Sequence, residues 1–182
     1  MPVQIGQKRE SDFSDPLGLL SDCHRRIERF LDVLIVLADR FGGPLSPAER
    51  SSLEKSLVYF QESAPKHTAD EEESLFPRLR STGKAEKELG ALRILEGDHR
   101  EAARDHGIVD ALGRRWLRDD ALMEADAIEW QRALDRLSSL YRKHIALEDQ
   151  HVFPLAANLL SPEELATVGR EMADRRGVKT RT

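Results

Sequence analysis

Residues 67–77 read HTADEEESLFP and residues 144–154 read HIALEDQHVFP, so the chain contains two similar segments. In both segments a histidine is followed four positions later by a glutamate, and the segment ends in Phe-Pro. Side chains four positions apart lie on the same face of a helix. The repeat therefore predicts two helices that each present a histidine and a glutamate, one turn apart, to one interior.

The residues around the repeat favour an all-α fold. Aromatic residues make up only 5% of the chain, and apolar residues recur every three or four positions almost throughout. Helices are expected within residues 15–43, 46–81, 84–118 and 124–160, with capping boxes at Ser46–Glu49 and Ser161–Glu164. Short connections predict an up-down-up-down four-helix bundle followed by a short C-terminal helix.

The predicted organisation is a single bundle domain at residues 15–160 and a short helix at residues 161–174. Residues 1–14 are expected to form a flexible N-terminus, and residues 175–182 a frayed tail. Pro65 is expected to kink the second helix, and Phe41 to face inward at the end of the first.

Six polar residues interrupt the otherwise apolar inward faces at one level of the bundle. Each helical hairpin contributes two histidines, 43 positions apart in the first hairpin and 45 in the second, which suggests a duplicated hairpin. The six are His24, His67, Glu71, His99, His144 and Glu148. A buried carboxylate is costly unless a positive group satisfies it, and no lysine or arginine points inward at this level. A metal site is the favoured interpretation, over histidines that are merely hydrogen-bonded within the core.

The ligand types and their number suggest which metal binds. Imidazole and carboxylate without a thiolate cluster suit iron or manganese, and zinc or copper less specifically. Six ligands exceed the four-coordinate shell of a structural zinc ion, which favours two metals bridged by Glu71 and Glu148. A position would then stay open on each ion for dioxygen, peroxide or nitric oxide.

Other residues are weaker candidates for a role at this site. His106 and Tyr141 either line a pocket or donate protons, or are ordinary core residues. Glu72 and Asp149 either hydrogen-bond a ligating histidine or belong, with Asp70, to a solvated face. Cys23 is expected to be a passive thiol, and the Phe-Pro pairs are expected to close the bundle beside the site and bend its helices.

The motif resembles that of the hemerythrin-like family, the HHE cation-binding bundles. Their pattern is a histidine in the first and third helices and His-x-x-x-Glu ending in Phe-Pro in the second and fourth. The resemblance covers roughly residues 15–160. It implies that the four histidines are terminal ligands of a non-haem di-iron centre and that the two glutamates bridge the irons.

One position separates this chain from the oxygen-carrying members of that family. Those proteins have a further histidine one turn after the third-helix ligand, where this chain has Ala103. The set of four histidines and two glutamates is more similar to bacterial repair-of-iron-centres proteins, which are linked to oxidative and nitrosative stress. This resemblance implies redox chemistry on a small oxidant rather than reversible oxygen carriage.

Composition limits the possible partners. The net charge is −5, and no basic face suggests a nucleic acid or an anionic membrane as partner. No apolar run approaches the ~20 residues of a membrane span, no signal peptide is evident and one cysteine excludes an internal disulfide, so a cytoplasmic protein is expected.

Two classes of function follow from these features. The first is a di-iron oxidoreductase, catalase-like or nitric oxide-consuming, that protects against oxidative stress. The second is a binding module for oxygen or iron sensing, storage or iron donation, which would hand its signal or metal to a redox or iron-acceptor protein. Zinc bound without redox chemistry is a third interpretation.

Overall fold

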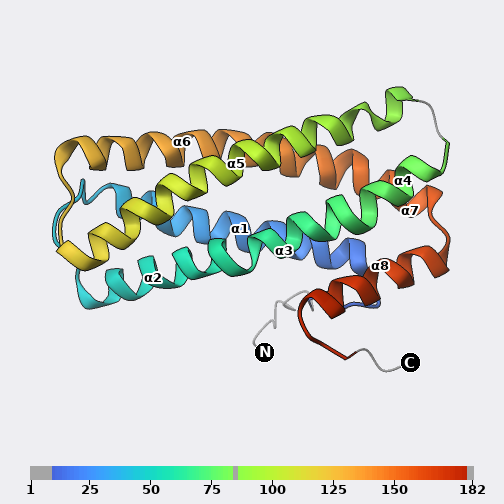
Figure 1. The fold of residues 1–182 in the computed structure, drawn as a ribbon, viewed down its shortest axis with the longest axis horizontal. Helices are drawn as coiled ribbons and strands as arrows, with labels where there is room; N and C mark the ends of the chain where they lie inside the picture. The colour runs from blue at the N-terminus through green and yellow to red at the C-terminus, as the bar shows by residue number, and fades with distance from the viewer. Residues whose placement is uncertain (1–9, 84–85, 180–182) are drawn as a thin grey trace, which may run out of the picture.

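Helices form the four arms of a bundle in this computed structural model, which describes residues 10–83 and 86–179 (Figure 1). The first arm is α1 (Pro16–Ala38), and the third is α5 (Glu86–Asp119). The second arm is built from α2 (Pro47–Glu62), α3 (Ala64–Ala69), the π-helix η1 (Asp70–Leu75) and α4 (Phe76–Ser81). The fourth is built from α6 (Glu124–Leu147), the π-helix η2 (Glu148–Val152) and α7 (Phe153–Leu159). The predicted up-down-up-down bundle is confirmed.

Capping residues set the helix starts where the sequence places them. The Asp15 side chain accepts from the Gly18 N–H at the start of α1, and Ser46 and Glu49 form a capping box at the start of α2. The second arm is interrupted at Ser63, directly before the α3 turn that contains Pro65, as expected for a proline that lacks an N–H donor.

The first helix ends earlier than predicted. It stops at Ala38, and the chain then turns through Phe41 (φ 46°) and Gly42 (φ 73°), so Phe41 is 50% exposed instead of facing inward. A Cβ on Gly42 would lie 2.9 Å from the Leu122 Cβ, and the Leu122 N–H donates to the Gly42 carbonyl at 2.8 Å. Glycine is therefore required at residue 42, both by its positive φ and by its close contact with the α5–α6 connection at the same end of the bundle.

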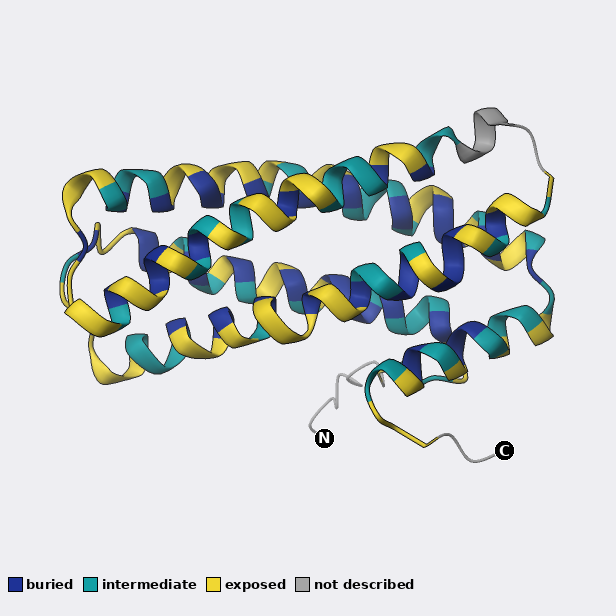
Figure 2. Ribbon diagram, in the orientation of Figure 1, coloured by how far each residue is buried: buried dark blue, intermediate teal, exposed yellow. Residues whose placement is uncertain are grey.

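Each arm turns a buried stripe inward and an exposed stripe outward (Figure 2). The buried apolar side chains form two clusters, and the polar residues of the predicted site lie between them. The larger cluster contains Trp116 and Trp130, whose rings meet edge to face at 5.7 Å, and it fills the end near the α1–α2 connection. The smaller cluster contains Phe76 and Phe153 and fills the other end.

A further helix, α8 (Pro162–Arg175), packs beside η1 and α1 (Figure 1). A capping box of Ser161 and Glu164 begins it, as predicted, and Val168 and Met172 bury its apolar face in the smaller cluster. Among the described residues, no helix is long and apolar enough to cross a bilayer.

Charged contacts fix α8 to the bundle and correct the prediction for Asp70. Asp70, predicted on a solvated face, is fully buried, where Arg175 and Arg176 both pair with its carboxylate. These two arginines begin the tail at residues 175–182 that is predicted to fray, which stays a prediction, and residues 180–182 lie outside the described residues. In the predicted flexible N-terminus, the Ser11 N–H donates to the buried Asp22 carboxylate, and residues 1–9 lie outside the described residues.

We expect Asp70→Asn to lower the free energy of unfolding of the metal-free protein by roughly 3 kcal/mol, because it removes the buried partner of two arginines. Urea unfolding in the presence of a chelator measures this loss. The matched control is Glu73→Gln, because Glu73 also pairs with Arg175 but is 66% exposed. The control should change stability by less than about 0.5 kcal/mol. Equal small effects of both variants would show that the clamp on Asp70 contributes little.

Candidate metal centre

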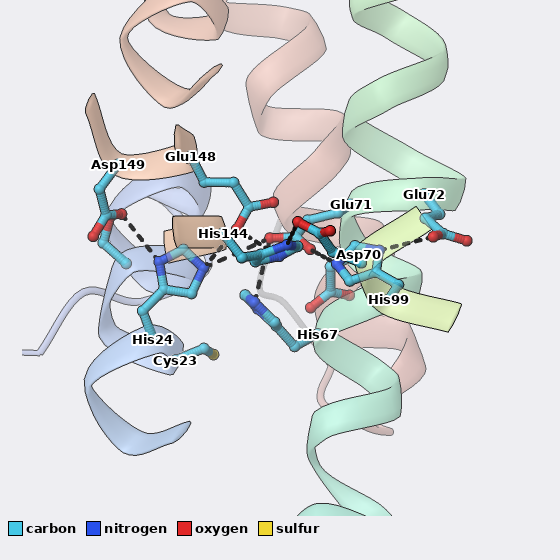
Figure 3. A network of polar contacts seen from close by, with 12 residues as sticks. Cys23, His24, His67, Asp70, Glu71, Glu72, His99, His144, Glu148 and Asp149 are labelled. Carbon is cyan, nitrogen blue, oxygen red and sulfur yellow. Dashed lines mark hydrogen bonds and ion pairs between the residues drawn. The ribbon is translucent and has the colours of Figure 1, made fainter. Parts of the chain in front are cut away.

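The structure brings the six predicted polar residues together from all four arms in one layer of the bundle (Figure 3). Histidines come from α1, α3, α5 and α6, and one glutamate comes from each π-helix. Five of the six are at most 4% exposed, and the His99 side chain is 8% exposed. The layer is therefore a polar cluster enclosed by apolar packing.

The two π-helices begin at this layer. The Phe76 N–H donates to the Glu71 carbonyl, and the Phe153 N–H donates to the Glu148 carbonyl, five positions back in each case. This wider register turns both the glutamate and the phenylalanine into the interior. The Phe153 ring stacks on His24 at 5.4 Å, and the Phe76 ring lies parallel to His99 at 6.4 Å. Each Phe-Pro pair thus packs against a histidine of the cluster.

Glu148 lies between histidines from two arms. Its Oε2 atom is 3.0 Å from His24 Nε2 and 3.2 Å from His144 Nε2. Burial acts to raise the pKa of Glu148, but the neighbouring His144 and His24 imidazoles lower it well below the usual value. Glu148 is therefore charged inside the bundle.

Glu71 occupies the corresponding place in the first half. Its Oε1 atom is 3.3 Å from His67 Nε2, and its Oε2 atom is 3.2 Å from His99 Nε2. Burial, and then the charge of Glu148, raise the pKa of Glu71 to about 7. Two carboxylates this close cannot both be charged without a cation between them.

Protons on histidine supply that compensation in the metal-free protein. Against the effect of burial, Asp149 and Glu148 raise the pKa of His24 to about 10. In the same way Glu71 raises the pKa of His99 to about 9. Burial and the adjacent His24 lower the pKa of His67 well below its usual value, so this ring is neutral.

The polar atoms converge on a centre without hydrogen-bonding to one another. Although the N···O distances are short, seven donor or acceptor atoms on the inner side of the cluster are buried with no hydrogen-bond partner among the described residues. They are the Nε2 atoms of His24, His67 and His99 and all four carboxylate oxygens of Glu71 and Glu148. Buried polar atoms are rarely left unpaired in this way. Cations at the centre would satisfy them.

The donor geometry fits metal binding. Two groups each offer four ligand atoms within 4.8 Å of one another, and both groups use Glu71 and Glu148. One group adds His24 and His67, and the other adds His99 and His144. The cluster is therefore compatible with metal binding, and the carboxylates of Glu71 and Glu148 belong to both groups.

A second set of carboxylates contacts the outer nitrogen of three histidines. Asp149 Oδ1 lies 3.1 Å from His24 Nδ1, and Glu72 Oε1 lies 2.8 Å from His99 Nδ1. The structure thus places both of these predicted residues against histidines of the cluster.

The third such carboxylate belongs to Asp98, whose Oδ2 lies 3.3 Å from His144 Nδ1 and which sequence analysis did not single out. Its signal was its position immediately before His99, which turns it toward the neighbouring arm. Contacts of this kind orient an imidazole and increase its basicity as a metal ligand.

A cavity of about 430 Å³ opens onto the cluster from the side of the larger apolar cluster. All four histidines line it, together with apolar side chains such as Leu57, Phe60 and Val109. Ala103, the position of the extra histidine in oxygen carriers, is an exposed residue in its lining. A small molecule that enters this cavity reaches the four histidines directly.

His106 and Tyr141 supply two polar groups to the cavity wall. His106 Nε2 lies 2.8 Å from the Tyr141 hydroxyl, and its ring stacks on Phe60 at 4.3 Å. Burial lowers the pKa of His106 to about 4 and raises that of Tyr141, so both are neutral near pH 7. Neither belongs to the metal-binding groups, which leaves them free to contact a bound molecule.

We expect metal binding at pH 7 to release roughly two protons, because His24 and His99 are protonated in the metal-free protein and must lose those protons to coordinate. Raising the pH removes the competing protons, so affinity should rise roughly 100-fold per pH unit between pH 6.5 and 8. Calorimetric titration with Co²⁺ in buffers of different ionisation enthalpy counts the protons.

The variant Asp149→Asn provides the control for this count. It removes the largest of the contacts that raise the pKa of His24, so fewer protons should be released than from the unsubstituted protein. Proton release that stays near zero in the unsubstituted protein would contradict the assigned charges.

Comparison with known proteins agrees with the fold and the cluster. A protein of Haemophilus influenzae described as uncharacterised is 29% identical over 175 residues, which cover 92% of this chain and 93% of that protein. Residues 15–156 match the hemerythrin HHE cation binding domain, and this span includes all six residues of the cluster. The chain therefore belongs to the hemerythrin HHE cation-binding family.

Proposed function

We propose that this protein is a non-haem di-iron protein that binds and turns over a small oxidant, namely peroxide, dioxygen or nitric oxide, in oxidative or nitrosative stress defence. The convergence of seven buried, unpaired donor atoms on one centre carries the proposal. Two groups of four donors with two shared carboxylates favour a pair of ions over one.

The donor chemistry favours iron. Each group consists of two imidazoles and two carboxylates, which suits iron or manganese, whereas thiolate-rich sets favour zinc. The only cysteine, Cys23, is buried and belongs to neither group. Manganese and zinc remain the competing metals, and elemental analysis distinguishes them.

The cavity supports access by a small substrate. It joins the cluster to the surface near Ala103, and its apolar lining limits the number of competing water molecules at the site. When bound, a pair of irons would supply the two electrons that reduction of a peroxide requires. The cavity would hold the substrate against the donors while the buried side chains keep other reductants away.

His106 and Tyr141 are suited to handle protons beside the substrate. Burial keeps the Tyr141 hydroxyl protonated, so it can donate a hydrogen bond to an oxygen atom that gains negative charge. The neutral His106 imidazole, 2.8 Å from that hydroxyl, can hydrogen-bond to it and orient it. Tyr141 is thus an oriented proton donor at the wall of the cavity.

Metal analysis combined with activity assays tests the proposal. Iron-loaded protein is expected to contain two irons per chain, to absorb in the near ultraviolet and visible, and to consume hydrogen peroxide or, without oxygen, nitric oxide. The comparison is free iron alone at an equal concentration. Rates no higher than those of free iron, or a spectroscopically silent metal as purified, would reject the proposal.

The second candidate is a binding module for sensing, storage or donation of iron without turnover. One observation favours it: Asp70, next to Glu71, ties η1 to α8 through Arg175 and Arg176. A change at the cluster therefore has a direct connection to the surface. If removing oxygen restores the original spectrum without loss of substrate, binding is favoured, whereas irreversible oxidation with substrate loss favours catalysis.

We expect Tyr141→Phe to lower kcat for peroxide roughly 100-fold while both irons still bind, because the variant removes the hydroxyl that donates to the substrate and no metal ligand. Steady-state kinetics with metal analysis on the same sample measure both quantities. The control is Tyr59→Phe, which removes a hydroxyl from a ring that stacks on Phe30 outside this cavity. An unchanged kcat in Tyr141→Phe would remove the hydroxyl from the mechanism.

A further inference from the structure

The two halves of the metal centre differ in how their histidines are held. His99 and His144 each place Nδ1 against a carboxylate, at 2.8 Å from Glu72 and 3.3 Å from Asp98. In the other half His24 has such a partner in Asp149, at 3.1 Å. His67 Nδ1 is buried and has no hydrogen-bond partner among residues 10–83 and 86–179.

The duplicated hairpin shows which residue is missing. Glu72 and Asp149 occupy equivalent positions, each directly after the shared glutamate of its arm. Asp98 directly precedes His99, and the equivalent residue in the first half is Cys23, which directly precedes His24. Where the second half has a carboxylate to support a histidine, the first half has a thiol.

A thiol cannot replace the carboxylate in this role. Cys23 carries no negative charge to stabilise an imidazole N–H, and sulfur is a weak acceptor. Its nearest polar contact is instead the Arg26 guanidinium, 3.4 Å from Sγ. The His67 ring therefore lacks the contact that would fix its orientation and increase its basicity.

The effect of such a carboxylate on metal affinity has a typical magnitude. Removing the partner of a ligating histidine typically lowers metal affinity 10- to 100-fold. Because the two groups share both glutamates, their histidines account for the difference between them. One group has two supported histidines, and the other has one.

We propose that the two metal positions are unequal: the His99–His144 position binds its ion first, and the His24–His67 position is the weaker and exchangeable one. The expected difference in dissociation constant is roughly 10- to 100-fold. This inference rests on the proposed two-metal centre and identifies the half from which an ion is lost or donated. His67, held by no hydrogen bond through its ring, is the ligand that releases it.

Titration of the metal-free full-length protein with Co²⁺ tests the order of binding. Calorimetry should resolve two steps of one ion each. Proton spectra of the one-equivalent sample should contain paramagnetically shifted Nδ1–H signals from His99 and His144, while the His24 signal appears shifted only in the second step.

Three variants separate this origin from a general effect of charge. Asp98→Asn should raise the dissociation constant of the first binding step at least 10-fold, so that the two dissociation constants become similar. Cys23→Asp gives the first half the carboxylate that the second half has in Asp98, so it should strengthen the second binding step. The uncharged Cys23→Ser should leave the ratio of the two dissociation constants unchanged. Far-ultraviolet circular dichroism confirms folding, and Asp98, at 25% side-chain exposure, tolerates asparagine if Cys23→Asp does not fold.

The outcomes distinguish this inference from the proposed function. Three results would overturn the proposal that the two metal positions are unequal. They are binding of both ions in one step, a shifted His24 signal in the first step, and an unchanged ratio of the two dissociation constants in Asp98→Asn. Stepwise binding in a protein whose iron form shows no turnover would reject the proposed activity and leave this inference intact. Binding of a single ion in total would reject both.

Discussion

The structure depends on two carboxylates buried in an apolar interior. Glu71 and Glu148 are completely inaccessible, and between them they contact the inner nitrogens of four imidazoles. In the absence of metal, protons on His24 and His99 compensate their charge. Metal and protons therefore compete for the same cluster, and the fold provides a place where one of them must be present.

The π-helices are the local structures that make this burial possible. An α-helix would carry Phe76 and Phe153 away from the face that bears the glutamates, because five positions exceed one turn by more than a residue. The wider turn that begins at each acidic segment returns both side chains to the interior. The π-helical hydrogen bonds in the second and fourth arms thus turn a glutamate and a phenylalanine into the interior at the same level of the bundle.

Duplication explains the shared features of the two halves, and the differences between them show what each half adds. The residue before Glu71 is Asp70, which two arginines of the C-terminal segment hold, whereas the residue before Glu148 is Leu147. The first half is thus fixed from outside by α8 but lacks the carboxylate that Asp98 supplies to His144 in the second. The first half has the stronger support for its backbone, and the second half has the fuller support for its histidines.

Much of this arrangement could be predicted from the sequence, because helical periodicity and a repeated His-x-x-x-Glu constrain both the fold and the level at which the six residues meet. The π-helices could not be predicted, because the sequence does not show which carbonyl accepts the hydrogen bond from the Phe76 or Phe153 N–H. Asp70 lies in an acidic run that reads as a solvated face, and only the packing of α8 shows its burial. Asp98 was missed because a contact between arms depends on their separation as well as their order.

The surroundings of the cluster bear on its chemistry more than the ligands do. In the oxygen carriers that this chain resembles, a fifth histidine would occupy the position of Ala103; here a methyl group lines the cavity and can bind no metal. If two ions bind there, the four histidines and two glutamates would hold them and would leave room for an exchangeable ligand. The cavity places His106 and Tyr141 on its wall, within reach of a molecule bound there. An open position beside the Tyr141 hydroxyl, a proton donor, would suit bond-breaking chemistry better than storage of an intact oxygen molecule, and this favours the proposed turnover over carriage.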